Sequence, residues 1–296
     1  MSIKSKYTSK DVSDPTAGEN QYVTLPFPAL RLNWFNGVPQ NKAFKDTRHF
    51  GGWFAGSDKV AEDLPAMGVD ALPAQFGQGE EFVARAGESF NAYEARFLYV
   101  APICLKDDWY SELNDQGVMA KRHRIDLLSL LGTHVKGQPI MPWGAAVLSA
   151  KGFAATAVVQ AMRAFVKVTA DVRRVTAKDV PTMFFYVPIG TFGDKLITAP
   201  AGNSIYTPAQ IMPVEWDEAA LEALYVDDEA WQDALVNMQA DAKSWLADTR
   251  GKREKTAVNT EDVGGVVPEG DYPDEIIDGS LSRQAFAPAK KKLPFD

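Results

Sequence analysis

The 296-residue sequence is poor in cysteine and histidine. Cys104 is the only cysteine, which excludes an intrachain disulfide and a cysteine-rich metal site. The three histidines, at positions 49, 123 and 134, include no pair at the i, i+4 spacing of helical metal ligands. The N-terminal residues lack the apolar run of a signal peptide, and no later stretch approaches the length of a membrane span. We therefore expect a soluble, cytoplasmic protein that needs no cofactor or metal.

The motifs of the common enzyme classes are missing as well. The sequence contains no Gly-x-Ser-x-Gly nucleophile elbow, no Walker loop and no Gly-x-Gly-x-x-Gly after a predicted strand. Adjacent carboxylates such as Asp107 and Asp108 point in different directions, which fits a solvated surface. We expect a protein that is not an enzyme. A nuclease whose metal-binding acids are dispersed along the chain stays an alternative.

Charge and apolar content divide the chain into four parts. Residues 1–20 have no periodicity and are predicted to form a disordered arm, whereas residues 21–211 are predicted to form a β-rich core domain with one central helix. Residues 212–249 are strongly acidic and predict a helical hairpin packed on the core. Residues 250–296 are rich in glycine and proline, and we expect a flexible tail. The formal net charge of −8 leaves room for a local basic surface.

Such a basic surface is suggested by residues 27–54, which interleave seven Phe or Trp side chains with four cations and one acid. Flat rings on which bases stack, together with cations for phosphates, are what a groove for single-stranded nucleic acid requires. The alternative is that these rings form the core of a β-hairpin that turns at Asn36-Gly37. The candidate stacking residues are Trp34, Phe35, Phe50, Trp53 and Phe54. The candidate phosphate contacts in this stretch are Arg31, Lys42, Lys45 and Arg48.

A second basic region runs from Lys121 to Lys178, with ten Lys or Arg residues against two acids. Lys121, Arg122 and Arg124 precede an apolar run that fits either a buried strand or a short helix. From Phe153 onward, apolar residues recur at the 3.6-residue spacing of a helix. We expect Lys121, Arg122, Arg124 and Lys151 to contact phosphates, with a solvated edge as the alternative for the first cluster.

The remaining pattern predicts an α+β protein with a β-barrel or a strongly curved sheet. Short alternating segments occur near residues 30–34, 49–54, 81–85 and 92–103, and an apolar aromatic strand is predicted at residues 181–188. Capping residues predict a short helix at residues 57–64, and two more helices are predicted at residues 217–225 and 228–246. The last two helices form the predicted acidic hairpin.

The chain ends with Leu293-Pro294-Phe295 on the predicted tail. This tripeptide resembles the terminal peptide of bacterial single-stranded-DNA-binding proteins, in which an acidic run precedes Ile-Pro-Phe or Leu-Pro-Phe. Here Asp296 follows the phenylalanine, and three lysines stand before the tripeptide. The ordered part is longer than the usual bacterial form and looks more like a phage or plasmid version. The resemblance implies an OB-like β-barrel, or a curved antiparallel sheet, with added helices and the helical hairpin.

These features together predict a protein that binds single-stranded DNA without sequence preference in replication, recombination or repair. The resemblance implies that Leu293, Pro294 and Phe295 recruit replication or repair proteins. We expect no membrane partner, and a homo-oligomer is compatible with the sequence. The alternative from another class is a protein-interaction, assembly or anti-defence factor without catalytic activity, whose exposed rings form a protein interface.

Overall fold

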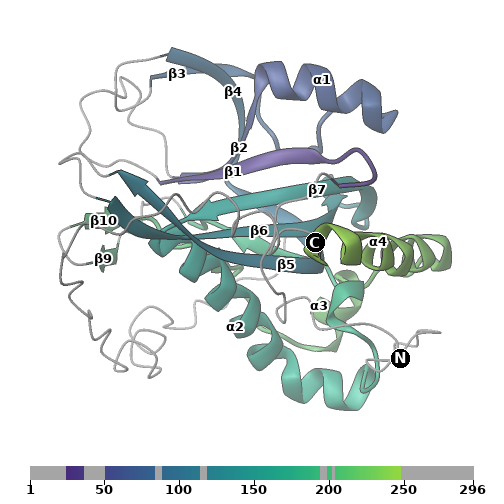
Figure 1. Ribbon diagram of the computed structural model, residues 1–296. Coiled ribbons are helices and arrows are strands. Elements are labelled where there is room, and N and C mark those ends of the chain that lie inside the picture. Colours follow the sequence, from purple (N-terminus) through teal and green to yellow (C-terminus); the bar gives the residue numbers. More distant parts are fainter. Residues whose placement is uncertain are drawn as a thin grey trace.

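The protein is an α+β structure built on one curled sheet (Figure 1). The structure, a computed structural model, describes residues 25–36, 51–83, 89–113, 119–193, 199–201 and 204–247. Nine strands form a mixed sheet that curls into a half-barrel, and helices pack around it. The predictions of an α+β class and of a strongly curved sheet are therefore confirmed.

The sheet has the strand order β11-β8-β5-β6-β7-β1-β2-β4-β3, and a separate pair joins β9 and β10. Its strands are β1 (Leu30–Asn36), β2 (Gly51–Gly56), β3 (Glu80–Val83), β4 (Ser89–Ala95), β5 (Phe97–Leu113), β6 (Met119–Thr133), β7 (Met141–Lys151), β8 (Val187–Gly190) and β11 (Gln210–Ile211). The small pair is β9 (Ala199–Ala201) and β10 (Ser204–Tyr206). One pairing, β1 with β7, is parallel, so the sheet is mixed rather than antiparallel as the alternative prediction had it.

The curl of the sheet brings strands β2 and β4 close to strands β5 and β8. Only Arg96 separates β4, which pairs with β2, from β5, which pairs with β6 and β8. The close approach needs glycine, because a Cβ on Gly52 of β2 would lie 2.5 Å from the Ala95 carbonyl oxygen. Across the interior, the Trp53 indole N–H donates to the Ile189 carbonyl of β8 at 3.2 Å. The strands thereby enclose a core of Leu, Ile, Val and aromatic side chains.

The helices lie on different sides of this sheet (Figure 1). They are α1 (Ser57–Met67), α2 (Phe153–Thr176), α3 (Glu218–Ala223) and α4 (Glu229–Ala247), and a 3-10 turn spans Thr182–Phe184. The helix α4 packs on the outer face of β5, where the Gln239 side chain donates to the Ile103 carbonyl at 2.9 Å. The opposite face meets α2, whose Thr156 hydroxyl lies 3.2 Å from the ring nitrogen Nδ1 of His123 in β6.

The helix α2 is the longest helix of the described part and covers the barrel core. By length and apolar composition alone it is a candidate membrane span, which the sequence analysis did not anticipate. Half of its apolar window is buried inside the protein, with Phe165 and Val158 fully enclosed. Its solvent side carries Arg163 and Lys167. A buried apolar inner side is what a core helix presents to a sheet. The outer side of α2 also exposes three valines, Val166, Val168 and Val175.

The element boundaries confirm most local predictions and correct two of them. The strand predicted at residues 92–103 is divided between β4 and β5 at Arg96. Strands form near residues 30–34 and 51–54, the 57–64 helix forms as α1, and the central helix forms as α2. The apolar run after Arg124 is a strand, β6. The predicted strand at residues 181–188 is wrong in its first half, because Thr182–Phe184 form a 3-10 turn and β8 begins only at Val187. The predicted terminal arm and tail lie outside the described residues.

Candidate nucleic-acid interface

Three of the predicted phosphate contacts, Arg31, Arg124 and Lys151, lie on the same face of the neighbouring strands β1, β6 and β7. Arg124 of β6 and Lys151 of β7 are direct cross-strand partners. Asn33 of β1 lies opposite Ser149 of β7, which lies opposite Asp126 of β6. Since side chains two residues apart share a face of a strand, Arg31, Arg124 and Lys151 belong to one face. We call this surface, with Asn33 and Ser149, the cationic strand face.

Within this face, Arg124 is held by a neighbouring acid. Its guanidinium Nη2 lies 3.1 Å from Asp126 Oδ1, and its Nε donates to the same oxygen at 3.3 Å. The Ser149 hydroxyl also donates to this carboxylate oxygen. The side chains of Arg124 and Asp126 are 27% and 10% exposed, so the ion pair is anchored at the sheet surface. The acid fixes the position of Arg124 and offsets one of the three positive charges.

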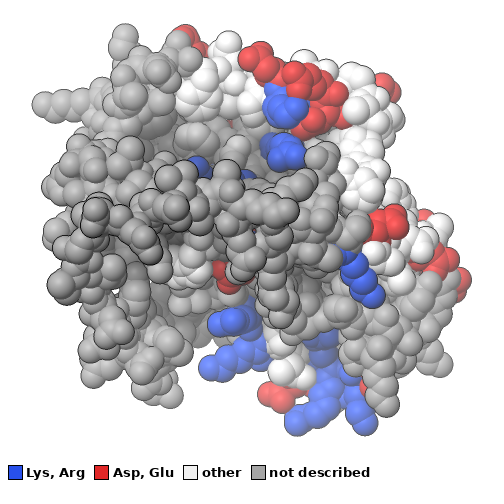
Figure 2. Space-filling view, viewed as in Figure 1, with Lys and Arg blue, Asp and Glu red and all other residues white. Residues whose placement is uncertain are grey.

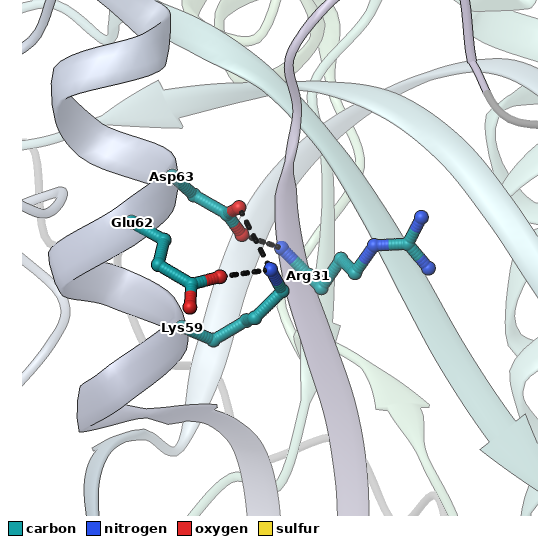
Figure 3. Close-up of polar contacts among 4 residues, drawn as sticks. All are labelled: Arg31, Lys59, Glu62 and Asp63. Carbon is teal, nitrogen blue, oxygen red and sulfur yellow. Dashed lines mark hydrogen bonds and ion pairs between the residues drawn. The ribbon is translucent and has the colours of Figure 1, made fainter.

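Arg31 lies beside the acids of α1 but is not neutralised by an ion pair with them (Figure 3). The Lys59 ammonium forms ion pairs with both carboxylates instead. Its Nζ lies 2.5 Å from Glu62 Oε2 and 3.6 Å from Asp63 Oδ1. The hydrogen bond from Lys59 lowers the pKa of Glu62 below its ordinary value. Arg31 contributes only its backbone N–H, which donates to Asp63 at 3.3 Å. Its guanidinium points away from these acids, over the strands (Figure 3).

The helix α4 limits the cationic strand face on the β5 side. Lys106 of β5 is the cross-strand partner of Asp126, but its side chain is buried and its ammonium lies 4.5 Å from the ring centroid of Trp245 in α4. A cation enclosed beneath an indole is stabilised by the ring and is closed to an external phosphate. The accessible cations therefore lie on β1, β6 and β7 rather than on β5.

The predicted stacking role of the N-terminal aromatics is corrected by their burial. Trp53 is fully buried, Phe54 is 2% exposed and Trp34 is 9% exposed. A base cannot stack on a ring whose faces are covered by protein, so the core alternative holds for these three residues. Phe35 is half-buried and packs on Phe54, with ring centroids 4.7 Å apart. It belongs to a small aromatic cluster at the β2–β4 end of the sheet.

Several predicted contacts fall where the structure gives no side-chain description. Lys42, Lys45, Arg48 and Phe50 lie in the connection between β1 and β2, outside the described residues. Lys121 and Arg122 lie in β6, opposite Ser111 and Tyr110 of β5, and only their backbone is described. The tail residues Leu293, Pro294 and Phe295 are also outside the described residues. These assignments stay predictions.

The second basic region of the sequence is divided between two sides of the protein. Arg124 and Lys151 lie on the outer strand face, whereas α2 packs on the opposite face. The solvent side of α2 carries its own cations, and Figure 2 shows Lys and Arg side chains gathered at the lower edge of the molecule, over α2. These exposed cations are Arg163, Lys167, Arg174 and, just beyond the helix, Lys178. A single surface containing all ten cations is therefore not formed.

The sequence analysis missed Trp109, the most exposed strand aromatic among the side chains that the structure describes. Its side chain is 51% exposed, in the part of β5 that pairs only with β6. Its ring is stacked on His123, with centroids 5.0 Å apart and planes inclined by 19°. The available signal was the basic run Lys121–Arg124, because a hairpin strand pairing with that run places an aromatic next to cations. Trp109 was overlooked because two acids separate it from the apolar part of the strand.

No group of three or more His, Cys, Asp or Glu side chains able to hold a metal is found among the residues that the structure describes. The chain matches no known family model, and no curated protein or solved structure shows significant similarity to it. The functional argument therefore depends on the geometry of the cationic strand face and of the β5–β6 hairpin.

Proposed function

We propose that this protein binds single-stranded DNA without marked sequence preference and without catalysing a reaction, with the DNA phosphates on the cationic strand face. The observation that carries the proposal is the convergence of Arg31, Arg124 and Lys151, which are far apart in the sequence, on one face of β1, β6 and β7. Neutralisation of phosphates by Lys and Arg supplies most of the affinity in nonspecific nucleic-acid binding. Asn33 adds a neutral hydrogen-bonding group beside the cations.

The arrangement of the strands supports the further proposal of an OB-like barrel. An OB-fold is a five-stranded, partly open barrel in which the first strand serves both ends of the sheet. Here β4 and β5 together correspond to such a shared strand, because β4 pairs with β2 and β5 pairs with β6. The strands β6, β7, β1 and β2 follow one another in the sheet between them. The helix α2 follows β7 directly, at the position of the helix that follows the third strand in OB-folds. The β1–β2 pair precedes the other strands in the sequence, which is a permuted order.

The connections at one end of the barrel support the same site. In OB-folds, oligonucleotides contact the face of the second and third strands and the loops that connect neighbouring strands beside it. The corresponding strands here are β6 and β7, which carry Arg124 and Lys151. The β1–β2 connection, which includes Lys42, Lys45 and Arg48, begins after Asn36, at the end of β1 that runs parallel to the end of β7. Two basic segments of the sequence thereby start beside one strand face.

The biological setting is part of the proposal rather than of the geometry. A role in replication, recombination or repair in the cytoplasm, encoded by a phage or plasmid, follows from the resemblance of the tail tripeptide. Recruitment of partner proteins is assigned to Leu293, Pro294 and Phe295 on the same ground. Removal of the last four residues should abolish such recruitment and leave DNA binding intact, because the cationic strand face does not include them.

The salt dependence of oligonucleotide binding tests the proposal. Fluorescence anisotropy of labelled oligo-dT, measured over a series of salt concentrations, gives the number of neutralised phosphates from the slope of log K against log salt. For single strands the slope is about −0.7 per phosphate contact. The double variant Arg31→Ala with Lys151→Ala should therefore reduce the magnitude of the slope by about 1.4. Both side chains are exposed, so the fold should be retained.

A matched variant removes the same charge from the other side of the protein. Arg163→Ala with Lys167→Ala lowers the net charge by the same amount on the solvent side of α2. This variant should keep the wild-type slope, because its cations are outside the cationic strand face. Equal losses in both variants would indicate a diffuse electrostatic effect. Absence of binding at low salt would favour the protein-interaction role, and cleavage of the oligonucleotide after addition of Mg²⁺ or Mn²⁺ would favour a nuclease.

A further inference from the structure

The hairpin formed by β5 and β6 extends past the end of β7 and carries an exposed pair of stacked rings. Trp109 and His123 are direct cross-strand partners, and the indole and imidazole planes are nearly parallel at 19°. The His123 side chain is 12% exposed, whereas that of Trp109 is 51% exposed. One face of the indole thus lies on the imidazole. A tryptophan with so much exposed surface on a strand is unusual, because its burial would otherwise stabilise the fold.

The imidazole beneath Trp109 is fixed by hydrogen bonds to two other elements. His123 Nε2 lies 2.6 Å from Asp107 Oδ1, on the neighbouring strand, and Nδ1 lies 3.2 Å from the Thr156 hydroxyl of α2. The backbone carbonyl of His123 also accepts a hydrogen bond from the N–H of Gly152, just before α2. With both ring nitrogens engaged, the imidazole is restricted to one orientation. The indole therefore rests on a support that does not rotate away.

The residues next to this pair carry positive charge. Lys121 and Arg122 precede His123 along β6, and Arg124 follows it as part of the cationic strand face. Arg124 and His123 are adjacent, so they lie on opposite faces of the strand. The pairing of β6 with β7 ends at Arg124, and Gly152 covers the backbone edge of His123. Among the described residues, the part of β6 before His123 pairs with β5 alone. A flexible polyanion on the cationic strand face can therefore pass over this outer part of β6 to reach Trp109.

We propose that Trp109, supported by His123, is a stacking site for one unpaired base of a single-stranded nucleic acid whose phosphates lie on the cationic strand face. This inference rests on the proposed function and adds a base contact to a site that otherwise consists of phosphate contacts. Every base has a flat face, so stacking on an indole tolerates any sequence. The role that the sequence assigned to Trp34 and Trp53 is thereby transferred to a different tryptophan.

The test compares oligo-dT with an abasic oligonucleotide of the same length, which has the phosphates but not the bases. Stacking contributes about 1–3 kcal/mol per base, which corresponds to roughly a 5- to 150-fold change in affinity. Trp109→Ala should weaken binding of oligo-dT by a factor in this range and leave the affinity for the abasic strand unchanged. Trp109→Phe should retain most of the oligo-dT affinity, since it keeps a flat ring.

Fluorescence gives a second readout that does not depend on affinity alone. Oligo-dT should quench part of the tryptophan emission of the wild-type protein, and this part should be absent in Trp109→Phe at saturating oligo-dT.

Thr156→Val removes one hydrogen bond to the imidazole and should weaken oligo-dT binding less than Trp109→Ala does. Thr156 acts as a positioning residue, so its variant should also leave the abasic strand unaffected.

The outcomes separate this inference from the proposed function. Wild-type affinity of Trp109→Ala for oligo-dT, with normal salt dependence, would overturn the stacking site and keep the DNA-binding function. Equal losses of oligo-dT and abasic binding would also overturn it, because the indole would then affect phosphate contacts. If the wild-type protein binds neither strand at low salt, both the proposed function and the stacking site are wrong.

Discussion

Two pairs of strands, β1–β2 and β5–β6, place a tryptophan opposite another aromatic ring, with opposite results. Trp34 and Trp53 are direct cross-strand partners whose ring centroids lie 5.0 Å apart at 79°, and both are in the core. Trp109 and His123 are also direct partners with centroids 5.0 Å apart, but the indole is half exposed. The strand pattern and the ring separation are therefore the same, and the surroundings differ.

The surroundings differ because the sheet closes around one pair and not around the other. The Trp34 indole N–H donates to the Thr207 carbonyl and that of Trp53 to the Ile189 carbonyl, both at 3.2 Å. These acceptors are supplied by distant parts of the chain, which reach the β1–β2 pair only because the sheet curls. The outer part of β5 pairs with β6 alone. The comparison teaches that the curl of the sheet, rather than local sequence, decides whether a strand tryptophan is buried or exposed.

Replacement of each tryptophan by alanine gives the largest expected difference. Trp53→Ala creates a cavity in the closed part of the barrel and removes the partner of the Ile189 carbonyl. Its free energy of unfolding should fall by about 3–5 kcal/mol. Trp109→Ala should lower it by only about 0.5–1.5 kcal/mol, the contribution of an aromatic pair, since half of the side chain is already in water. Urea unfolding followed by circular dichroism measures both values.

Similar losses in the two variants would contradict the comparison. A large loss in Trp109→Ala would mean that the indole stabilises the hairpin through His123, and a small loss in Trp53→Ala would mean that the barrel interior collapses around the cavity. Trp53→Phe is the control for cavity size. It keeps a ring but not the indole N–H, so it should be less destabilised than Trp53→Ala.

Substitution of two glycines of β2 tests how tightly this strand packs against the junction between β4 and β5. A Cβ on Gly52 would lie 2.5 Å from the Ala95 carbonyl oxygen and 3.0 Å from the Cα of Arg96. Because these are backbone atoms, Gly52→Ala must displace β2 from the β4–β5 junction, at a cost of about 1–3 kcal/mol. A Cβ on Gly56 meets no atom within 4 Å, so Gly56→Ala is the control without a clash. Because Gly56 is the N-cap of α1, this control should lose only the small advantage of glycine over alanine at a cap. Equal unfolding midpoints for the two variants would show that the junction is not tightly packed.

Much of the fold could be predicted from local patterns. The acid in the first turn of α1 and the apolar spacing of α2 both indicate helices, so these elements were predictable. The predicted side-chain cap of α1 was wrong, because its N-cap is Gly56 and no side chain caps it. The 3-10 turn at Thr182–Phe184 was not, because a short apolar aromatic run has no periodicity that distinguishes a turn from a strand. The parallel pairing of β1 with β7 was also inaccessible, since it joins segments more than a hundred residues apart.

The candidate site was also predictable only in part. The cations were predictable as a set, because clusters of Lys and Arg in an acidic chain indicate a basic surface, and three of them do share a face. The aromatics were not predictable, because rings with the same alternation occur in the core and on the surface. Arg163 and Lys167 were grouped with Lys151 by sequence, but the course of the chain through α2 places them on the other side of the sheet.

An effect that is absent at neutral pH concerns β5 alone, whose inner half is enclosed by the curled sheet. Burial raises the pKa of Tyr99 to about 12, and its hydroxyl has no hydrogen-bond partner in the described part of the chain. The unfolded chain ionises near the ordinary tyrosine value of 10.0, so stability is complete below that pH and falls as the pH rises toward 12. The contribution of Tyr99 to this loss approaches about 1.4 kcal/mol per pH unit. Urea unfolding at a series of alkaline pH values measures it.

Tyr99→Phe isolates this contribution from that of the other buried groups. Cys104, on the same strand, also has its pKa raised to about 12 by burial, and the pKa of Tyr186 is raised as well, so the wild-type protein loses stability from several sources. Tyr99→Phe should reduce the loss of stability per pH unit at alkaline pH and leave the loss caused by the other buried groups unchanged. It should cost little at neutral pH, because the removed hydroxyl makes no hydrogen bond in the described part. An unchanged slope would mean that water reaches the inner half of β5, and that the contrast between its enclosed and exposed halves is smaller than the burial of Tyr99 indicates.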